Sequence, residues 1–401
     1  MKKLLFMAAL AGFALTSCTN DHEEDIVNKN EPQKITFASP VMYGHTRANI
    51  VDAEQGGPTG SHLPYDMRET FRVFGATYTT SDNSVNWSTN AVYGEGAGEI
   101  AYYNQYLKGW DTQTPHFWEA SKLYTFAAYS PAEIADDCNS TEPTINDKGL
   151  TIPAYTTPAM GQQYDLMYAP AVYNKTSSSI VTPNADQYNG VNLVFKHALS
   201  SVHFKVGVHP DYLKTIVGDK ATEANKFNIK NITITGVAAT GAFDEKATTN
   251  SETGAALDYE AHVDATGYDH WTPSGTAGNY EFVNAPFTLS YTSEDENKTY
   301  DKVAKDLQEI NAENHIGFMI PQALTNAATI TIKWAYDSAD QTDVVLRLNG
   351  NDINSITEAW KMGKRYTYTI MFSKNRIYFA PQVSDWTDDN PTTPNAPIVI
   401  Q

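Results

Sequence analysis

Apolar and polar side chains alternate with a period of two along many segments of this chain, and that pattern restricts it to β-sheet structure. Residues 202–208, 330–334 and 366–372 each place apolar side chains on one face and polar side chains on the other. Strands with one apolar face are what antiparallel sandwiches need. No rhythm of strand, helix and strand is present, so a parallel sheet is disfavoured. The same reasoning predicts further strands at 34–37, 71–78, 123–130, 191–196 and 227–234.

Local departures from the alternation carry their own predictions. Within residues 227–234 the apolar positions slip by one residue at Lys230-Asn231, which indicates a β-bulge. Helical signals are few: residues 301–311 place three apolar side chains on one face, and residues 211–217 predict one short turn of helix. The stretches rich in Gly, Asn and Thr predict surface loops between strands, at 174–190 and 244–279.

Composition excludes one class of function. The chain has 24 Tyr, 16 Phe and 7 Trp, and aromatics at this density favour strand interiors over ligand platforms. The formal net charge is -19, and so acidic a surface repels phosphate backbones. We therefore expect no nucleic-acid partner. A length of 401 residues suggests two to three domains.

The N-terminus has the features of a secretory signal. Lys2 and Lys3 precede twelve uncharged residues, 4–15, which are too few to form a permanent membrane span. Leu15-Thr16-Ser17-Cys18 then follows the pattern of the bacterial lipobox, in which the cysteine after the cut receives a lipid. We expect residues 1–17 to be removed as a signal peptide and Cys18 to carry a lipid anchor such as palmitate. The alternative is an ordinary secreted protein with a chance cysteine near its cleavage site.

Catalytic and metal-binding patterns are missing from the sequence. It contains no G-x-S-x-G elbow, no H-E-x-x-H pair and no phosphate-binding loop, and its ten histidines lack metal-ligand spacing. Gly94–Gly98 has the wrong spacing for a dinucleotide site and predicts a turn. We expect no enzyme, no cofactor and no metal, and we interpret His197, Trp360 and Trp386 as core residues. A glycan-degrading enzyme would need a carboxylate or metal site that the sequence does not offer.

Six short phrases in a fixed order carry a family resemblance. They are Lys34–Phe37 with Thr46–Ala48, Trp118 with Tyr124–Pro131, Asp165–Ala169, Phe195–Phe204, Ile320–Gln322 with Ala328–Trp334, and Trp360–Tyr368 with Val383–Trp386. Behind a lipobox, this series resembles the fimbrillin family of Bacteroidales, the subunits of type V pili. The resemblance covers most of the chain after residue 33.

The resemblance implies an all-β fold of two tandem transthyretin-like Greek-key β-sandwich domains with few short helices. We expect a lipidated tether and removable first strand at 18–47, an N-terminal sandwich domain at 48–188 and a C-terminal sandwich domain at 189–401. The polar, acidic residues 19–33 predict a flexible tether. Their acidic cluster is similar to the surface-export signal of Bacteroidales lipoproteins, which implies the outer face of the outer membrane. A plain solvated tether is the alternative.

The resemblance also implies an assembly mechanism. A protease that cuts after arginine removes the first strand of the anchored precursor, and the loss exposes unpaired backbone groups and apolar pockets. A strand from another subunit then fills the groove by β-augmentation. Arg47-Ala48 follows the strand expected at Lys34–Ser39, and Arg47 is the first of only six arginines, so we expect the cut between Arg47 and Ala48. Alternatively, Arg47 is a loop arginine that is never cut.

The C-terminus is the candidate donor strand. Asp388–Ala396 is a Pro/Thr/Asn spacer that cannot pair as a central strand. An apolar tip follows, and because it is only five residues long, a longer donor strand would recruit residues from Ile377–Phe379. A frayed tail and a strand that closes its own domain are the alternatives. The tip consists of Pro397, Ile398, Val399, Ile400 and Gln401.

Two functional hypotheses follow. The first is a structural or adhesive subunit of a cell-surface pilus, or fimbria, that polymerises by donor-strand exchange. Its implied partners are other pilus subunits of the same or another kind, an arginine-specific maturation protease, and a host protein or glycan. The second is a lipoprotein of the same fold that stays anchored to the outer membrane and binds a glycan or host protein. The sequence leaves the position in the pilus open among stalk, tip and anchor.

Overall fold

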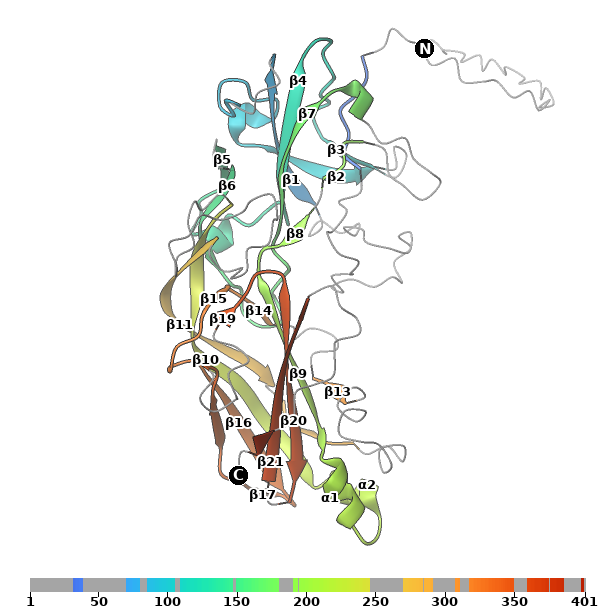
Figure 1. Ribbon diagram of the computed structural model, residues 1–401, viewed down its shortest axis with the longest axis vertical. Helices are drawn as coiled ribbons and strands as arrows, with labels where there is room; N and C mark the ends of the chain where they lie inside the picture. Colours follow the sequence, from blue (N-terminus) through green and yellow to red (C-terminus); the bar gives the residue numbers. More distant parts are fainter. Residues whose placement is uncertain are drawn as a thin grey trace, which may run out of the picture.

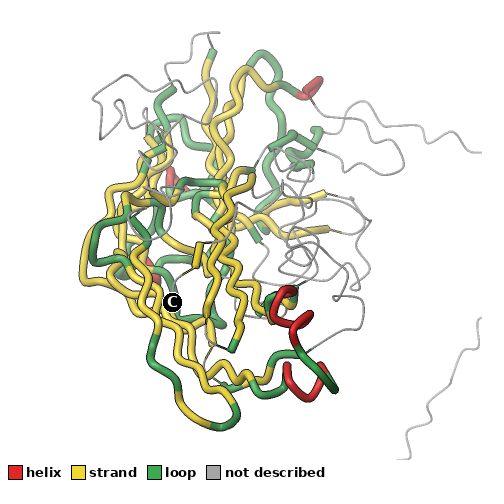
Figure 2. The backbone as a smooth tube through the Cα atoms, turned by 60° about the horizontal axis from the view of Figure 1, so that its bottom comes forward, coloured by secondary structure: helices red, strands yellow, loops and turns green. Residues whose placement is uncertain are grey.

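Strands make up most of the computed structural model, and they form an elongated molecule with few short helices (Figures 1 and 2). The predicted all-β sandwich fold is therefore confirmed. The structure describes residues 32–38, 70–79, 85–104, 109–146, 149–179, 190–193, 195–245, 270–283, 285–290, 307–310, 317–349, 359–374, 376–385 and 398–399.

The first sheet occupies the upper part of Figure 1 and has the antiparallel order β3-β2-β1-β4-β7-β8. Its central strands combine aromatic and small side chains, and β4 buries every residue after its first. The predicted strands at 71–78 and 123–130 are confirmed. The strands are β1 (Phe71–Tyr78), β2 (Glu99–Asn104), β3 (Gly109–Thr112), β4 (Leu123–Ser130), β7 (Met167–Lys175) and β8 (Lys196–His197).

The second sheet is organised by β10 (Phe227–Asp244), an 18-residue strand that runs through the middle of the molecule. One half of β10 pairs with β16 and the other half with β6, while β11 runs along much of its length. The remaining strands are β5 (Thr144–Asn146), β6 (Gly149–Thr156), β11 (Trp271–Val283), β12 (Phe287–Thr288), β16 (Thr329–Tyr336), β17 (Ala339–Asp340) and β18 (Val344–Arg347).

The third sheet has the order β13-β9-β20-β21-β22, with β14 also paired to β9. Strands β9 and β20 pair in parallel from Ser201↔Arg365 to Val208↔Phe372, an arrangement that the alternation did not predict. Both faces of these strands are largely buried. A separate pair joins β15 to β19. The strands are β9 (Ser200–Val208), β13 (Gln308–Glu309), β14 (Gly317–Met319), β15 (Gln322–Ala323), β19 (Ala359–Trp360), β20 (Lys364–Ser373), β21 (Arg376–Asp385) and β22 (Ile398–Val399).

Helices in the described residues are short. The predicted turn of helix is present as α1 (Pro210–Thr215), and it is followed by α2 (Lys220–Ala224). Three 3-10 turns complete the set, at Gly94–Gly96, Asp136–Cys138 and Ser177–Ser179. The first of them confirms the predicted glycine turn. No helix in the described ranges is long and apolar enough to cross a membrane.

The helix predicted over residues 301–311 is wrong where the structure describes it. Gln308 and Glu309 form β13 and pair with Val206 and Lys205 of β9, and Ile310 donates its N–H to the Phe204 carbonyl. Leu307 packs on Met371. An isolated helix of this length is marginal in water, and the edge of β9 offers the same backbone groups ready partners.

The loop predicted at 244–279 and the strand predicted at 191–196 both need correction. The loop predicted at 244–279 ends early, because β11 begins at Trp271 and pairs with β10. The strand predicted at 191–196 contributes only its end to β8, and β8 pairs with β7 of the first sheet instead of opening new hairpins. Strand pairing thus crosses residue 189 in both directions, since β6 pairs with β10. The domain division at 188/189 stays a prediction.

The predicted β-bulge at Lys230-Asn231 is confirmed. Ile229 pairs with Trp334 and Asn231 pairs with Lys333, so Lys230 is the extra residue. The bulge keeps Ile229 and Ile232 on the same buried face. On the partner strand β16, Ile330 and Ile332 are buried as the alternation predicts.

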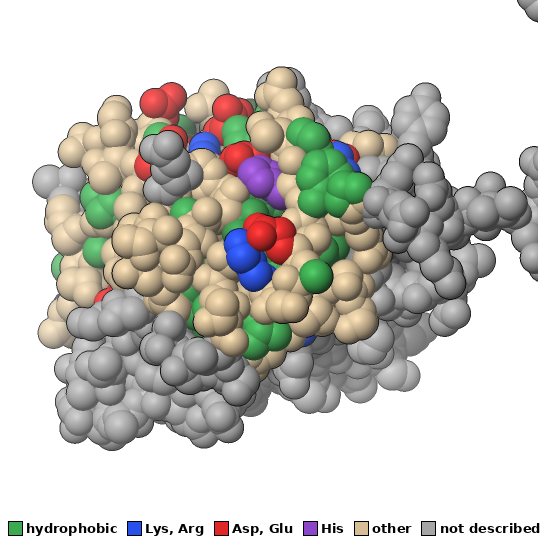
Figure 3. All heavy atoms as spheres, turned by 90° about the horizontal axis from the view of Figure 1, so that it is seen from above, with side chains coloured by type: hydrophobic (Ala, Val, Ile, Leu, Met, Phe, Trp, Pro, Cys, Tyr) green, Lys and Arg blue, Asp and Glu red, His purple; other side chains and the backbone are tan. Residues whose placement is uncertain are grey.

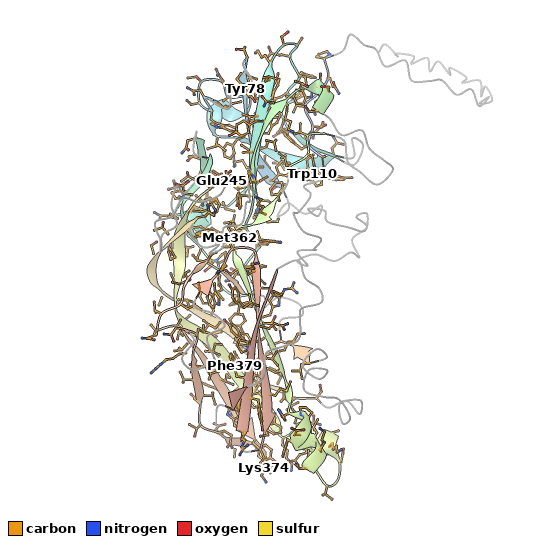
Figure 4. All side chains as sticks on the ribbon, viewed as in Figure 1. Tyr78, Trp110, Glu245, Met362, Lys374 and Phe379 are labelled. Carbon is orange, nitrogen blue, oxygen red and sulfur yellow. The ribbon has the colours of Figure 1, made fainter. Side chains whose placement is uncertain are left out.

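Three large apolar clusters form most of the core of the described residues. The lower cluster lies between β10, β16, β9, β20 and β21, and the upper one surrounds Phe71 and Phe126 of the first sheet. The middle cluster combines residues from both halves of the chain, including Phe74, Phe243 and Met362, and Figure 4 places Met362 near mid-height. The two halves therefore share a core as well as strand pairs.

Gly236 marks the tightest backbone approach in β10. It has φ +78°, and a Cβ there would lie 1.8 Å from the Ala327 carbonyl oxygen. We expect Gly236→Ala to lower the free energy of unfolding by about 3 kcal/mol or more, because strain and overlap combine. Gly218→Ala is the matched control: its φ is +121°, but nothing lies within 4 Å, so we expect a loss of about 1–2 kcal/mol. Urea unfolding measures both, and equal losses would contradict the overlap.

Candidate functional site

Residues 33–38 form a short extended segment that hydrogen-bonds to the first sheet at β3 and beyond. The Phe37 N–H donates to the Trp110 carbonyl at 2.9 Å, and the Trp110 N–H donates back to Phe37 at 3.0 Å. The Ile35 N–H donates to the His116 carbonyl at 2.7 Å, and the Trp118 N–H donates to the Gln33 carbonyl at 2.9 Å. The bridge between Phe37 and Trp110 is antiparallel.

The other edge of this segment pairs with Val191 in parallel. The Ala38 N–H donates to the Val191 carbonyl at 2.9 Å, and the Val191 N–H donates to the Thr36 carbonyl at 2.8 Å. Val191 lies five residues before β8, which is the last strand of the first sheet, whereas β3 is the first. Residues 33–38 therefore bridge β3 and Val191. Six backbone hydrogen bonds hold them there, each worth about 0.5–1.5 kcal/mol net.

Two side chains of the segment complete the upper core. Ile35 is 1% exposed and Phe37 is 0% exposed. The Phe37 ring meets Phe71 and Phe126 edge to face, with centroids 5.8 and 5.4 Å away, and lies 6.2 Å from Tyr93. Burying one phenylalanine contributes roughly 1.5–3 kcal/mol. Removal of the segment would expose this aromatic pocket together with six backbone polar groups.

Charged groups flank the same segment. The Lys34 ammonium lies 2.5 Å from an Asp111 carboxylate oxygen, and the Asn104 amide donates to that oxygen at 3.4 Å. The His116 ring nitrogen lies 3.1 Å from Glu99. Burial, with a smaller contribution from Glu99, raises the pKa of Tyr93 well above its usual value, so this pocket residue is a neutral phenol.

Gly190 is required for the close approach of the segment. Its φ is +141°. A Cβ at this position would lie 2.4 Å from both the carbonyl carbon and the carbonyl oxygen of Thr36, and 2.5 Å from the carbonyl carbon of Phe37. Only a residue without a side chain leaves room for the first strand. Neither Gly190 nor Asp111 is apparent as a site residue from sequence alone, because Asp111 lies 77 positions from Lys34.

Most of the predicted site residues fall outside the described ranges, so their roles stay predictions. The strand predicted at 34–37 is present, although it forms bridges and hydrogen bonds instead of a named strand. Trp386 also falls outside. The predicted lipidation, cleavage and donor residues that the structure does not describe are Cys18, Arg47, Ala48, Pro397, Ile400 and Gln401.

The described part of the C-terminal tip is β22. Ile398 pairs with Phe379 and Val399 pairs with Tyr378, so the tip lies antiparallel on β21 at the edge of its own sheet. This matches the alternative of a strand that closes its own domain. Ile377–Phe379, suggested as an extension of the donor strand, lie in β21, which pairs with β20 along its whole length, and Ile377 and Phe379 are fully buried. Their part in a donor strand stays a prediction.

The residues predicted to be core residues are buried. His197 is 6% exposed, and its Nδ1 lies 2.6 Å from an Asp165 carboxylate oxygen. Trp360 is fully buried and donates its indole N–H to the Tyr368 hydroxyl at 3.0 Å. Within the described ranges, no three His, Cys, Asp or Glu side chains come together as a metal site.

The close approach at Gly190 makes a local prediction. We expect Gly190→Ala to displace residues 33–38 and to speed trypsin cleavage after Lys34 by at least about tenfold, because the freed backbone fits a protease. Mass spectrometry over a digestion time course follows that bond. Gly218→Ala is the control and leaves the rate unchanged. An equally protected Lys34 in Gly190→Ala would refute the steric argument.

The chain is similar to solved structures of fimbrial proteins. A fimbrial protein from Bacteroides vulgatus is 13% identical over 88% of this chain and 100% of its own, with a TM-score of 0.50. The tip fimbrial protein Mfa3 from Porphyromonas gingivalis, truncated at its C-terminus, is 10% identical over 88% of this chain and 100% of its own, with a TM-score of 0.36.

No curated protein matches the chain in sequence. A family model described as fimbrillin-like, however, matches residues 65–386, which is most of the chain. That range includes every named strand except β22 and begins just before β1. The chain therefore belongs to the fimbrillin-like family.

Proposed function

We propose that this protein is a subunit of a cell-surface pilus and polymerises by donor-strand exchange after its N-terminal segment is removed. The observation that carries the proposal is the pairing of residues 33–38 with the β3 edge of the first sheet and with Val191. These residues make strand-like bonds on both edges and insert Phe37 into an aromatic core, yet they precede the rest of that sheet by more than thirty positions. A cut in the connecting chain would separate the strand from the sheet that it completes.

The positions of the two candidate strands support polymerisation. Trp110, which bonds to the first strand, lies in the upper half of the molecule, and Phe379, which pairs with the C-terminal tip, lies in the lower half (Figure 4). A donor at one end and a groove at the other define a head-to-tail contact. Head-to-tail contacts that do not close into a ring generate filaments.

Delivery to the surface is the remaining part of the proposal. Cys18 would anchor the precursor to the outer membrane by lipid, and an arginine-specific protease would cut between Arg47 and Ala48. The cut would discard the anchor together with Lys34–Ala38. Membership of the fimbrillin-like family supports a cell-surface location and a non-enzymatic role.

A second candidate function has one observation in its favour. The tip β22 lies on β21 of its own sheet, so each described end of the molecule is closed. Such a molecule would serve as a permanently anchored lipoprotein that binds a glycan or host protein. The end face seen in Figure 3 presents acidic and basic side chains near one another among hydrophobic ones, and this mixture suits a protein partner.

Maturation is tested by changing the predicted cleavage residue. We expect Arg47→Ala, produced in a native-type host, to retain lipidated Cys18 and to form no high-mass ladders on unheated gels. The wild-type polymer should begin at Ala48 by N-terminal sequencing. Arg68→Ala, the next arginine along the chain, is the control and should assemble normally. Wild-type ladders made entirely of chains that begin at Cys18 would rule out this maturation.

The donor strand is tested by truncation. We expect deletion of Pro397–Gln401 to abolish the ladders and to leave a folded monomer, since only two described residue pairs join the tip to β21. Circular dichroism and urea unfolding check the fold of the monomer. Normal ladders from the truncated chain would show that the donor lies elsewhere.

A further inference from the structure

The site of residues 34–38 sets requirements for any strand that replaces them. Such a strand runs antiparallel to the backbone near Trp110 and parallel to Val191. The bonds recorded for the described segment use the N–H groups of Ile35, Phe37 and Ala38, and the Lys34 N–H takes no part in them. Apolar side chains are needed two residues apart, at the positions of Ile35 and Phe37.

The C-terminal tip of this chain meets these requirements in one register. Placing Ile398 at the position of Ile35 puts Ile400 at the position of Phe37, so both apolar positions are filled. Pro397 then takes the place of Lys34, whose N–H, like that of Thr36, donates none of the backbone hydrogen bonds of the described segment, so the missing N–H of proline costs none of them. The five residues Pro397–Gln401 then correspond one to one to positions 34–38.

We propose that Pro397–Gln401 of a second copy occupies positions 34–38, with Pro397 at the position of Lys34. In this register, Asp111 is the groove residue that discriminates between strands by the charge of the side chain at that position. The inference rests on the proposed function, because the groove opens only after the first strand is removed. It adds the register and the side chain that distinguishes one donor from another.

Asp111 faces this position with a strong preference for a cation. Its side chain is 14% exposed and holds the Lys34 ammonium at 2.5 Å, and the Asn104 amide makes a longer contact with the same carboxylate oxygen at 3.4 Å. Proline cannot supply a positive charge, so the donor leaves a mostly buried carboxylate without its ion pair, which is unfavourable. The native strand therefore fits the groove better than the donor does. This difference would favour the native strand over the donor for as long as the native strand stays attached.

The register is tested with a double-mutant cycle on assembled ladders, using Pro397→Lys, Asp111→Asn and the double variant. We expect Pro397→Lys to slow ladder dissociation in dilute detergent by about twofold to fivefold, the range of a partly exposed ion pair. In the Asp111→Asn background the same substitution should change the rate by less than about 1.5-fold. Added salt should reduce the gain. Asp136→Asn, an exposed carboxylate of the same half, is the control and should preserve the full gain.

Each outcome bears on one claim. An equal gain from Pro397→Lys with Asp111 and with Asn at that position would overturn the register, even though ladders form. A gain at Ile398→Lys that depends on Asp111 would move the register by one residue and also overturn it. Ladders made entirely of uncut chains that begin at Cys18 would instead refute the proposed maturation, whatever the cycle shows.

Discussion

The pairing of β10 is the interaction on which the rest of the structure depends. This single strand bonds to β6, β11, β12 and β16, and its side chains enter both the lower core and the middle core. Its register shifts, including the bulge at Lys230, keep apolar residues inward as the strand passes from one core to the next. Gly236 serves the same end by letting the chain before β16 approach closely.

β10 and β11 are long enough to place side chains in both the lower and the middle core. They therefore hold the upper sheet against the lower part of the molecule, and the N-terminal strand is not needed as a link. Residues 33–38 instead close the upper sheet from β3 to Val191. They contribute core side chains and backbone hydrogen bonds. Each named strand of the first sheet, however, also pairs with another named strand of that sheet. A strand of this kind is separable in principle, since another extended segment with similar side chains offers the same bonds.

Strands with strong alternation, such as β9, β16 and β20, and the bulge at Lys230 were predictable from sequence because burial of one face imposes a period of two. Strands in which apolar and polar residues alternate weakly were not predictable from sequence. Residues 271–283 are rich in Gly, Thr and Ser and form β11 only because β10 offers a partner along its length. Gln308–Glu309 joins β9 for the same reason, although its neighbours have helical spacing. Pairing across the chain overrode local preference in both places.

By itself the sequence determined the all-β class, the main strands, the first strand and the apolar character of the C-terminal tip, because each depends on residues adjacent in the chain. Only the tertiary structure decided which groups surround the first strand. Asp111, Gly190 and Val191 come from separate segments, and folding alone brings them against Lys34, Thr36 and Phe37. The physical reason is that a groove forms by backbone pairing between segments far apart in the sequence, and the spacing of residues along the chain does not predict which segments pair.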